Sequence, residues 1–148
     1  MTWYAELSEW HELGRELSSL RTVGWLDRDH TFPTGSIEPR AYGKLKELSQ
    51  DPWEPCVSMG IHHCELCVYE PERVGGRNLF IPSTDCIFVA PELITHYMNA
   101  HEYAPPNEFL QAVLECPPMR SMEYYKALLA AGGRLLIQSS RMSRPMNL

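Results

Sequence analysis

The feature that most constrains the fold of this 148-residue chain is a pair of cysteines followed by a pair of histidines. Two residues separate Cys64 from Cys67, and four residues separate His96 from His101. Two thiolates and two imidazoles make a complete tetrahedral ligand set for zinc, and both spacings lie within the ranges of structural zinc sites. Such a set requires distant parts of the chain to meet at one point. We therefore predict a Zn²⁺ site whose ligands are Cys64, Cys67, His96 and His101.

The elements around these residues predict how the ligands converge. Short apolar runs over 79–81 and 87–89 flank a Pro-Ser-Thr-Asp turn, which predicts a β-hairpin. The segment 91–101 begins with proline and continues with apolar residues at helical spacing, so it predicts a helix that carries both histidines. A cysteine knuckle, a hairpin and a histidine-bearing helix are typical of ββα and treble-clef-like zinc units. The 28 residues between Cys67 and His96 exceed the spacer of about 12 in DNA-reading fingers, so we expect an enlarged unit embedded in a larger domain.

Several other segments show local structural patterns. Apolar residues at helical spacing, next to proline or glycine terminators, predict helices over 39–48, 107–116 and 121–131. The same spacing over 8–20 indicates a helix there, and a short strand is predicted over 23–26. Together these elements indicate an α+β fold with a small antiparallel sheet and three to four helices.

Length and composition favour one globular domain, because 44% of the residues are hydrophobic and 22% are charged. We expect a single α+β zinc-binding domain over 1–135 and a frayed basic tail over 136–148. The N-terminus lacks the basic and apolar parts of a secretory signal, and no run approaches the ~18 apolar residues needed to span a bilayer. The odd count of five cysteines suits a reducing compartment. We therefore expect a cytoplasmic protein that has no membrane partner.

The formal net charge of -6 is distributed unevenly. Residues 55–117 contain eight acidic and two basic residues, whereas residues 118–148 contain one acidic and five basic residues. The expected histidine-bearing helix over 91–101 has no lysine or arginine. Nucleic acids and anionic membranes bind positive surfaces, so an acidic zinc unit argues against both. A protein partner is expected instead, and the sequence leaves the oligomeric state open.

Two further sets of residues leave an enzymatic alternative open. His62 and His63 directly precede the first cysteine, and either could replace one of the proposed ligands. A site with three protein ligands would keep a position for water and could support hydrolysis. Asp27, Asp29 and His30 share one loop, where they could form an acid–base set or an additional metal site. The structural alternative is that Asp27 caps a turn and that the histidines pack beside the zinc knuckle.

The chain also resembles an uncharacterised bacterial family that carries the label of a domain of unknown function. The resemblance covers roughly residues 2–118 and rests on Gly24-Trp25-Leu26-Asp27, His30, Phe32-Pro33-x-Gly35, Gly60-x-His62-x-Cys64-x-x-Cys67, Ala90-Pro91-x-Leu93-Ile94-x-His96-Tyr97 and His101-x-Tyr103-x-Pro105-Pro106-x-x-Phe109-x-x-Ala112-Val113. It implies that the four proposed zinc ligands belong to one unit. It also implies a short hairpin-like opening rather than a helix near the N-terminus. No activity is implied by the resemblance.

These observations predict a small cytoplasmic protein with a structural zinc site that acts as a protein-interaction module. An immunity-like role, in which the protein neutralises a toxin, is a narrower form of this hypothesis. Four protein ligands leave no coordination position for a substrate, so an enzyme is the less favoured reading. A zinc-dependent hydrolase that uses His62 or His63 with Asp27 and His30 is the first alternative, and a nucleic-acid-binding zinc finger is the second.

Overall fold

The computed structural model describes residues 3–10, 19–55, 61–69 and 73–142 as five helices and two small sheets. In chain order the elements are β1 (Leu20–Thr22), α1 (Pro39–Ser49), β2 (His62–His63), β3 (Val74–Gly75), β4 (Asn78–Pro82), β5 (Ile87–Pro91), α2 (Ile94–His101), α3 (Asn107–Glu115), α4 (Met122–Ala130) and α5 (Arg134–Met142). The predicted α+β class is confirmed. None of these helices is long and apolar enough to cross a bilayer.

The larger sheet contains three strands in the order β1-β5-β4. The predicted hairpin is present as β4 and β5, which pair antiparallel from Asn78 opposite Pro91 to Pro82 opposite Ile87. The third strand, β1, joins the other edge of β5 in parallel, with Leu20 opposite Ile87. The sheet is therefore mixed rather than purely antiparallel.

Both faces of the β4–β5 hairpin are covered, because every residue of the two strands is buried. Side chains alternate between the two faces of a strand. On one face the ring of Phe88 packs edge-on against Phe109 of α3, with centroids 5.6 Å apart. On the other face Phe80 packs against Trp10 and Trp53, with centroids 6.0 and 5.9 Å apart. The core of the domain is thus centred on this hairpin.

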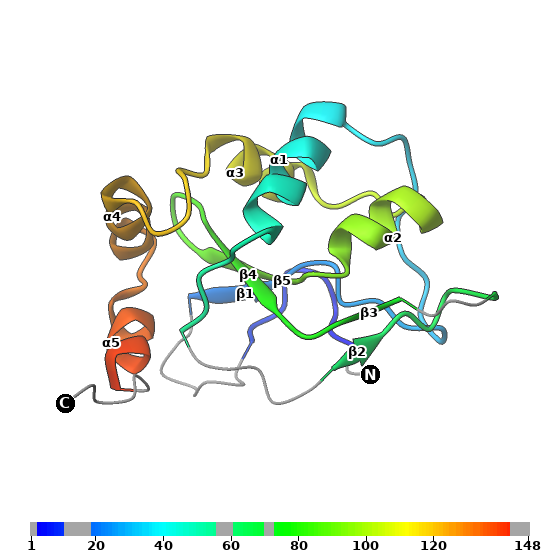
Figure 1. Cartoon of the computed structure of the whole chain (residues 1–148), viewed down its shortest axis with the longest axis horizontal. Coiled ribbons are helices and arrows are strands. Elements are labelled where there is room, and N and C mark those ends of the chain that lie inside the picture. The colour runs from blue at the N-terminus through cyan, green and yellow to red at the C-terminus, as the bar shows by residue number, and fades with distance from the viewer. Residues whose placement is uncertain (1–2, 11–18, 56–60, 70–72, 143–148) are drawn as a thin grey trace.

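The helices form two groups around the sheet (Figure 1). The first three helices, α1, α2 and α3, lie together above the sheet, where α1 contacts both α2 and α3. The last two, α4 and α5, lie at the opposite end of the molecule from α2. A hydrogen bond of 2.5 Å from the hydroxyl of Tyr124 to the carbonyl of Phe80 fixes α4 against β4. The candidate ligands on α2 are therefore remote from the C-terminal helices.

The predicted helices over 39–48, 107–116 and 121–131 are confirmed as α1, α3 and α4, with ends shifted by a few residues. The helix expected over 91–101 begins later, because Pro91 still belongs to β5 and α2 starts at Ile94. The strand predicted over 23–26 is wrong. Regular pairing ends at Thr22, and Gly24 takes a left-handed conformation with φ of 79°.

The two ends of the chain differ from expectation in informative ways. Glu9 forms an antiparallel bridge with Arg21, so residues 8–10 run beside β1 instead of starting a helix. The centre of that expected helix, residues 11–18, lies outside the described residues. Near the C-terminus, α5 occupies much of the segment that we expected to be a frayed tail, and its Leu136 and Ile137 are buried.

Candidate metal centre

The two cysteines lie on a knuckle that directly follows β2. The backbone N–H of Cys64 donates a 2.9 Å hydrogen bond to the carbonyl of Arg73, which ties the knuckle to the start of β3. A turn over 65–66 then brings Cys67 back toward Cys64. Cys64 is buried and Cys67 is half-buried. The two intervening residues therefore form the tight turn that the Cys-x-x-Cys spacing predicts.

The two histidines lie near opposite ends of α2. On an ideal helix, residues five positions apart differ by about 140° in direction, so the helix must end where the second ligand is needed. His101 is the last residue of α2, and Glu102 follows in the left-handed conformation with φ of 58°. The carbonyl of Tyr97 accepts the N–H of Glu102 and also that of Tyr103, which closes the end of the helix.

A neighbouring loop holds this helix end in place. The N–H of Gly35 donates to the carbonyl of Glu102, and the N–H of Ala104 donates to the carbonyl of Pro33, both at 2.9 Å. These bonds flank an isolated bridge between Thr34 and Tyr103. The Phe-Pro-x-Gly segment therefore positions the chain that leaves α2, which is a structural role rather than a chemical one.

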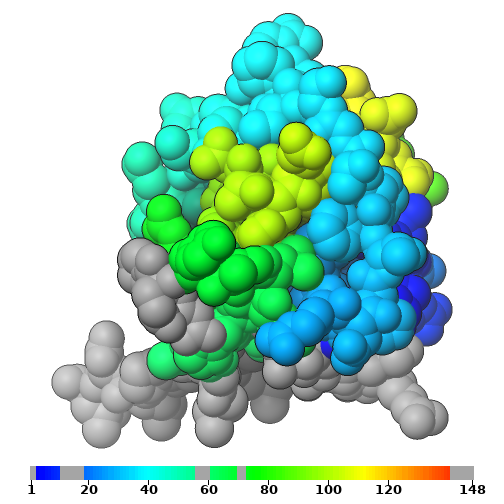
Figure 2. Space-filling view, turned by 90° about the vertical axis from the view of Figure 1, so that its right-hand side faces the viewer, coloured from blue at the N-terminus to red at the C-terminus, as the bar shows by residue number. Residues whose placement is uncertain are grey.

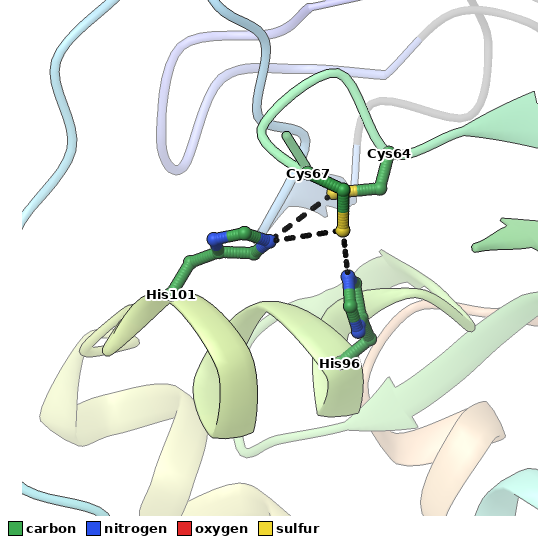
Figure 3. A group of neighbouring side chains, drawn as sticks. All are labelled: Cys64, Cys67, His96 and His101. Carbon is green, nitrogen blue, oxygen red and sulfur yellow. Dashed lines mark hydrogen bonds between the residues drawn. The ribbon is translucent and has the colours of Figure 1, made fainter. Parts of the chain in front are cut away.

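The four side chains converge on one point (Figure 3). The Sγ of Cys67 lies 3.2 Å from the Nε2 of His96 and 3.5 Å from the Nε2 of His101. The Sγ of Cys64 lies 3.4 Å from the same nitrogen of His101. All four ligand atoms lie within 4.8 Å of one another. In a tetrahedral zinc site, bond lengths of about 2.3 Å to sulfur and 2.0 Å to nitrogen place these atoms about 3.5 Å apart. The residues therefore fit a metal ion.

The electrostatics of the cluster also fit a cation. Burial lowers the pKa of His96, and the nearby His101 and Arg73 lower it further. Burial likewise lowers the pKa of His101, so both imidazoles favour the neutral form that can donate a lone pair. Burial raises the pKa of the Cys64 thiol and the side chain of Cys67 raises it further, whereas the backbone N–H groups of Leu66 and Cys67 oppose this shift. A bound cation would offset the cost of ionising two neighbouring thiols.

The structure thus brings together the four residues that the spacing singled out, and they could hold a metal ion. Among the described residues, no other group of three or more histidine, cysteine or acidic side chains is gathered in this way. Cys86 and Cys116 are separate free thiols. Burial raises the pKa of Cys116 to about 12, as expected for a thiol in the core.

His62 and His63 lie beside the cluster but are not members of it. His62 packs edge-on against Trp25, with ring centroids 5.4 Å apart, and burial lowers its pKa. His63 is exposed and lies opposite Val74 in the β2–β3 ladder. Consecutive residues of a strand face opposite sides, so these two histidines cannot both turn toward the same site.

Asp27 and His30 form a pair of their own. The Nδ1 of His30 lies 2.8 Å from the Oδ1 of Asp27, and that oxygen also accepts the backbone N–H groups of Asp29 and His30. Desolvation raises the pKa of Asp27, but the hydrogen bonds from His30 and Asp29 outweigh it and the net shift is downward. The ring of Trp3 stacks on His30 at 3.7 Å. This geometry matches the expected turn cap.

The Asp27–His30 loop nevertheless borders the knuckle. The Nε of Arg28 donates a 3.4 Å hydrogen bond to the carbonyl of Glu65. Glu65 lies between the two candidate cysteine ligands in the chain. Figure 2 shows this loop, the knuckle segment and α2 as neighbours on one face of the molecule. The loop therefore helps to shape the surface around the candidate metal centre.

The family comparison assigns residues 2–114 to a family described as a domain of unknown function, DUF7919. The chain belongs to this family. Comparisons with curated proteins and with solved structures gave no match. Membership of DUF7919 agrees with the resemblance seen in the sequence. The DUF7919 match includes the four candidate ligands and reaches almost to the end of α3, whereas α4 and α5 follow it.

Within the DUF7919 region, Glu6 is a positioning residue that the sequence did not reveal. One oxygen of its carboxylate accepts the N–H of Gly24 at 2.9 Å, and the other accepts the hydroxyl of Tyr103 at 2.6 Å. Tyr103 is buried two residues after His101. Glu6 therefore links the N-terminal segment to the end of the histidine-bearing helix. The sequence signal for this link is weak: a buried tyrosine hydroxyl usually has a hydrogen-bond partner, but its spacing along the chain does not identify Glu6.

Proposed function

We propose that Cys64, Cys67, His96 and His101 bind one Zn²⁺ ion and that this ion is structural. The supporting observation is the convergence of two sulfurs and two imidazole nitrogens at distances suited to tetrahedral coordination. When bound, zinc supplies a cross-link between the knuckle and α2 and compensates the charge of the two thiolates. Thiolate ligands require reduced cysteines, which supports a cytoplasmic location.

The need for such a cross-link follows from the size of the knuckle. The strands β2 and β3 contain two residues each, and so short an isolated hairpin is not stable in water. A metal ion that joins it to α2 adds binding free energy to folding. We infer that the zinc ion fixes the conformation of the cysteine knuckle over residues 64–67.

With all four coordination positions filled by protein, no position remains for a water molecule or a substrate. We therefore propose that this domain presents a protein-binding surface and does not use the metal for catalysis. The separation of His62, His63, Asp27 and His30 from the ligand cluster supports this choice over a hydrolase. The absence of lysine and arginine from α2 supports it over a nucleic-acid-binding finger.

Metal analysis of the full chain, purified without added metal, tests this proposal. We expect one zinc ion per chain. Its removal by a chelator should lower the melting temperature of the protein. Zinc content well below one ion per chain after zinc reconstitution would contradict the metal assignment. A zinc-bound water that titrates near neutral pH would contradict the structural role and favour the hydrolase.

A further inference from the structure

Four strongly exposed apolar side chains lie in the chain segments that flank the two candidate cysteine ligands. Ile61 is 70% exposed, Val68 is 85%, Tyr69 is 86% and Val74 is 54%. They are half of the eight large apolar side chains that are exposed in the part of the chain that the structure describes. Single exposed apolar residues are common on soluble proteins, but a concentration in one short segment marks an interaction site. We call these four residues the knuckle ridge.

The backbone explains why part of the knuckle ridge faces outward. In the β2–β3 ladder, His62 faces inward onto the Trp25 ring, whereas the next residue, His63, lies opposite Val74 on the outer face. Ile61 lies two positions before His63 and therefore belongs to the same outer face. The outer face of this small sheet is consequently apolar at both ends of its strands.

The other part of the knuckle ridge is attached directly to the candidate metal centre. Val68 and Tyr69 follow Cys67 immediately, and the hydrogen bond from Cys64 to the carbonyl of Arg73 closes the same segment from its other end. A metal ion bound by the cysteines would restrain the backbone that carries these side chains. A surface restrained in this way loses less conformational entropy on binding a partner.

The charge around the knuckle ridge selects the kind of partner. The segment 61–75 has three acidic residues and one basic residue in its sequence, and Glu65 lies on the knuckle itself. Arg28, which donates to the carbonyl of Glu65, belongs to a loop that also carries Asp27 and Asp29, so segments 27–30 and 61–75 have net charges of -1 and -2 in their sequence. Anionic bilayers and nucleic acids are repelled by such a surface, and a second copy of the chain would bring like charges together.

We propose that the knuckle ridge is the docking surface for a basic segment of another protein, in which lysine or arginine residues flank apolar side chains. This inference rests on the proposed interaction function and names its surface and its partner. The apolar side chains of the partner pack against Val68 and Tyr69, and its cations lie near Glu65. Aromatic side chains such as Tyr69 are frequent energetic centres of protein interfaces.

Selection from a random 12-residue peptide display library on the zinc-loaded full chain tests this proposal. We expect the enriched peptides to carry net positive charge and apolar residues, and to bind more weakly as salt concentration rises. The double substitution Val68→Ser with Tyr69→Ser should weaken their binding by about tenfold or more, as removal of an interface centre does. The matched control is Met122→Ser on α4, whose side chain is 63% exposed and remote from the ridge. It should leave the affinity unchanged.

The outcomes separate this inference from the proposed function. Zinc content and melting temperature of the double variant must equal those of the parent, which shows that only the surface has changed. If enriched peptides bind the double variant as tightly as the parent, or if they are acidic, the interaction function stands but the ridge assignment is overturned. If no peptide is enriched, or if the chain instead binds anionic vesicles, DNA or itself, both the inference and the proposed partner class fail.

Discussion

The Sγ of Cys67 lies 3.2 Å from the Nε2 of His96, although the two residues are 29 positions apart in the chain. This contact joins the knuckle after β2 to the first turn of α2. Cys67 and His96 are two of the four candidate ligands. The contact that positions α2 beside the knuckle is therefore also part of the proposed metal site. Substitutions on either side of it should therefore affect metal content and folding together.

Replacement of Cys67 by serine should abolish stoichiometric zinc binding. We expect the free energy of unfolding to fall by about 3 kcal/mol or more, which is a fraction of the roughly 10–16 kcal/mol that zinc supplies to zinc-finger peptides. Chemical denaturation and metal analysis of the same sample measure both effects. Cys86→Ser is the control, because Cys86 lies in the β4–β5 turn beside Ser83. If Cys67→Ser kept the zinc content of that control, Cys67 would not be a ligand.

Gly24 and Gly43 provide a matched pair of glycine substitutions. Gly24 has φ of 79°, and an added Cβ would lie 2.9 Å from the Cδ1 of Ile94 on α2. Gly24→Ala should therefore destabilise the fold by about 2 kcal/mol, from left-handed strain and from displacement of α2. Gly43 lies within α1, and an added Cβ would meet nothing within 4 Å. Gly43→Ala should instead stabilise the protein by about 0.5–1 kcal/mol. Urea denaturation of both variants tests the contrast, and equal effects would contradict it.

The Glu6–Tyr103 hydrogen bond should contribute to stability at the end of α2. Tyr103→Phe leaves a carboxylate oxygen of Glu6 without its donor, and we expect a loss of about 2 kcal/mol, as for hydrogen bonds to charged groups. A double-mutant cycle with Glu6→Gln measures the coupling between the two side chains. Additive effects in that cycle would show that the two residues stabilise the fold independently.

Glu54 should give the protein a pH-dependent stability. Burial raises the pKa of Glu54 above its ordinary value of 4.5, and the nearby Glu92 adds to the shift, while Asn78 and Arg77 oppose it. As the pH rises, the unfolded chain therefore loses the Glu54 proton at a lower pH than the folded protein does. The stabilisation linked to this proton is present below pH 4.5 and is lost as the pH rises through the pKa of the folded protein. Glu54→Gln should increase stability at pH 7 and have a shrinking effect toward pH 4. Denaturation midpoints across that range test this, and a gain independent of pH would contradict it.

The candidate ligands were predictable because each half of the site is encoded locally. A two-residue gap between Cys64 and Cys67 suits one tight turn, and Pro105 and Pro106 require α2 to end soon after His101. The chemistry of tetrahedral coordination then connects the two halves without any knowledge of the fold. The side chains that support the site, such as Glu6, have no comparable pattern because their partners are distant in sequence.

The parallel strand was missed for a related reason. Leu20 pairs with Ile87 far along the chain, and a strand of three residues is too short to show an alternating pattern. The C-terminal helix is not predicted from the sequence, because the last residues of the chain are polar and basic and include a proline, which indicates a frayed tail. Gly132 does end α4 with φ of 90°, but a new helix begins at Arg134. Tertiary packing of its apolar residues outweighs the polar composition of that segment.

X-ray absorption spectroscopy at the zinc edge of the full chain tests the central claim most directly. We predict one zinc environment with two sulfur ligands at about 2.3 Å and two imidazole nitrogens at about 2.0–2.1 Å. Cys67→Ser and His96→Ala, which each remove one ligand, should both lose the signal of this shell together with the bound zinc. A coordination shell that contains a water oxygen, or that remains unchanged in both variants, would contradict the structural Cys₂His₂ site.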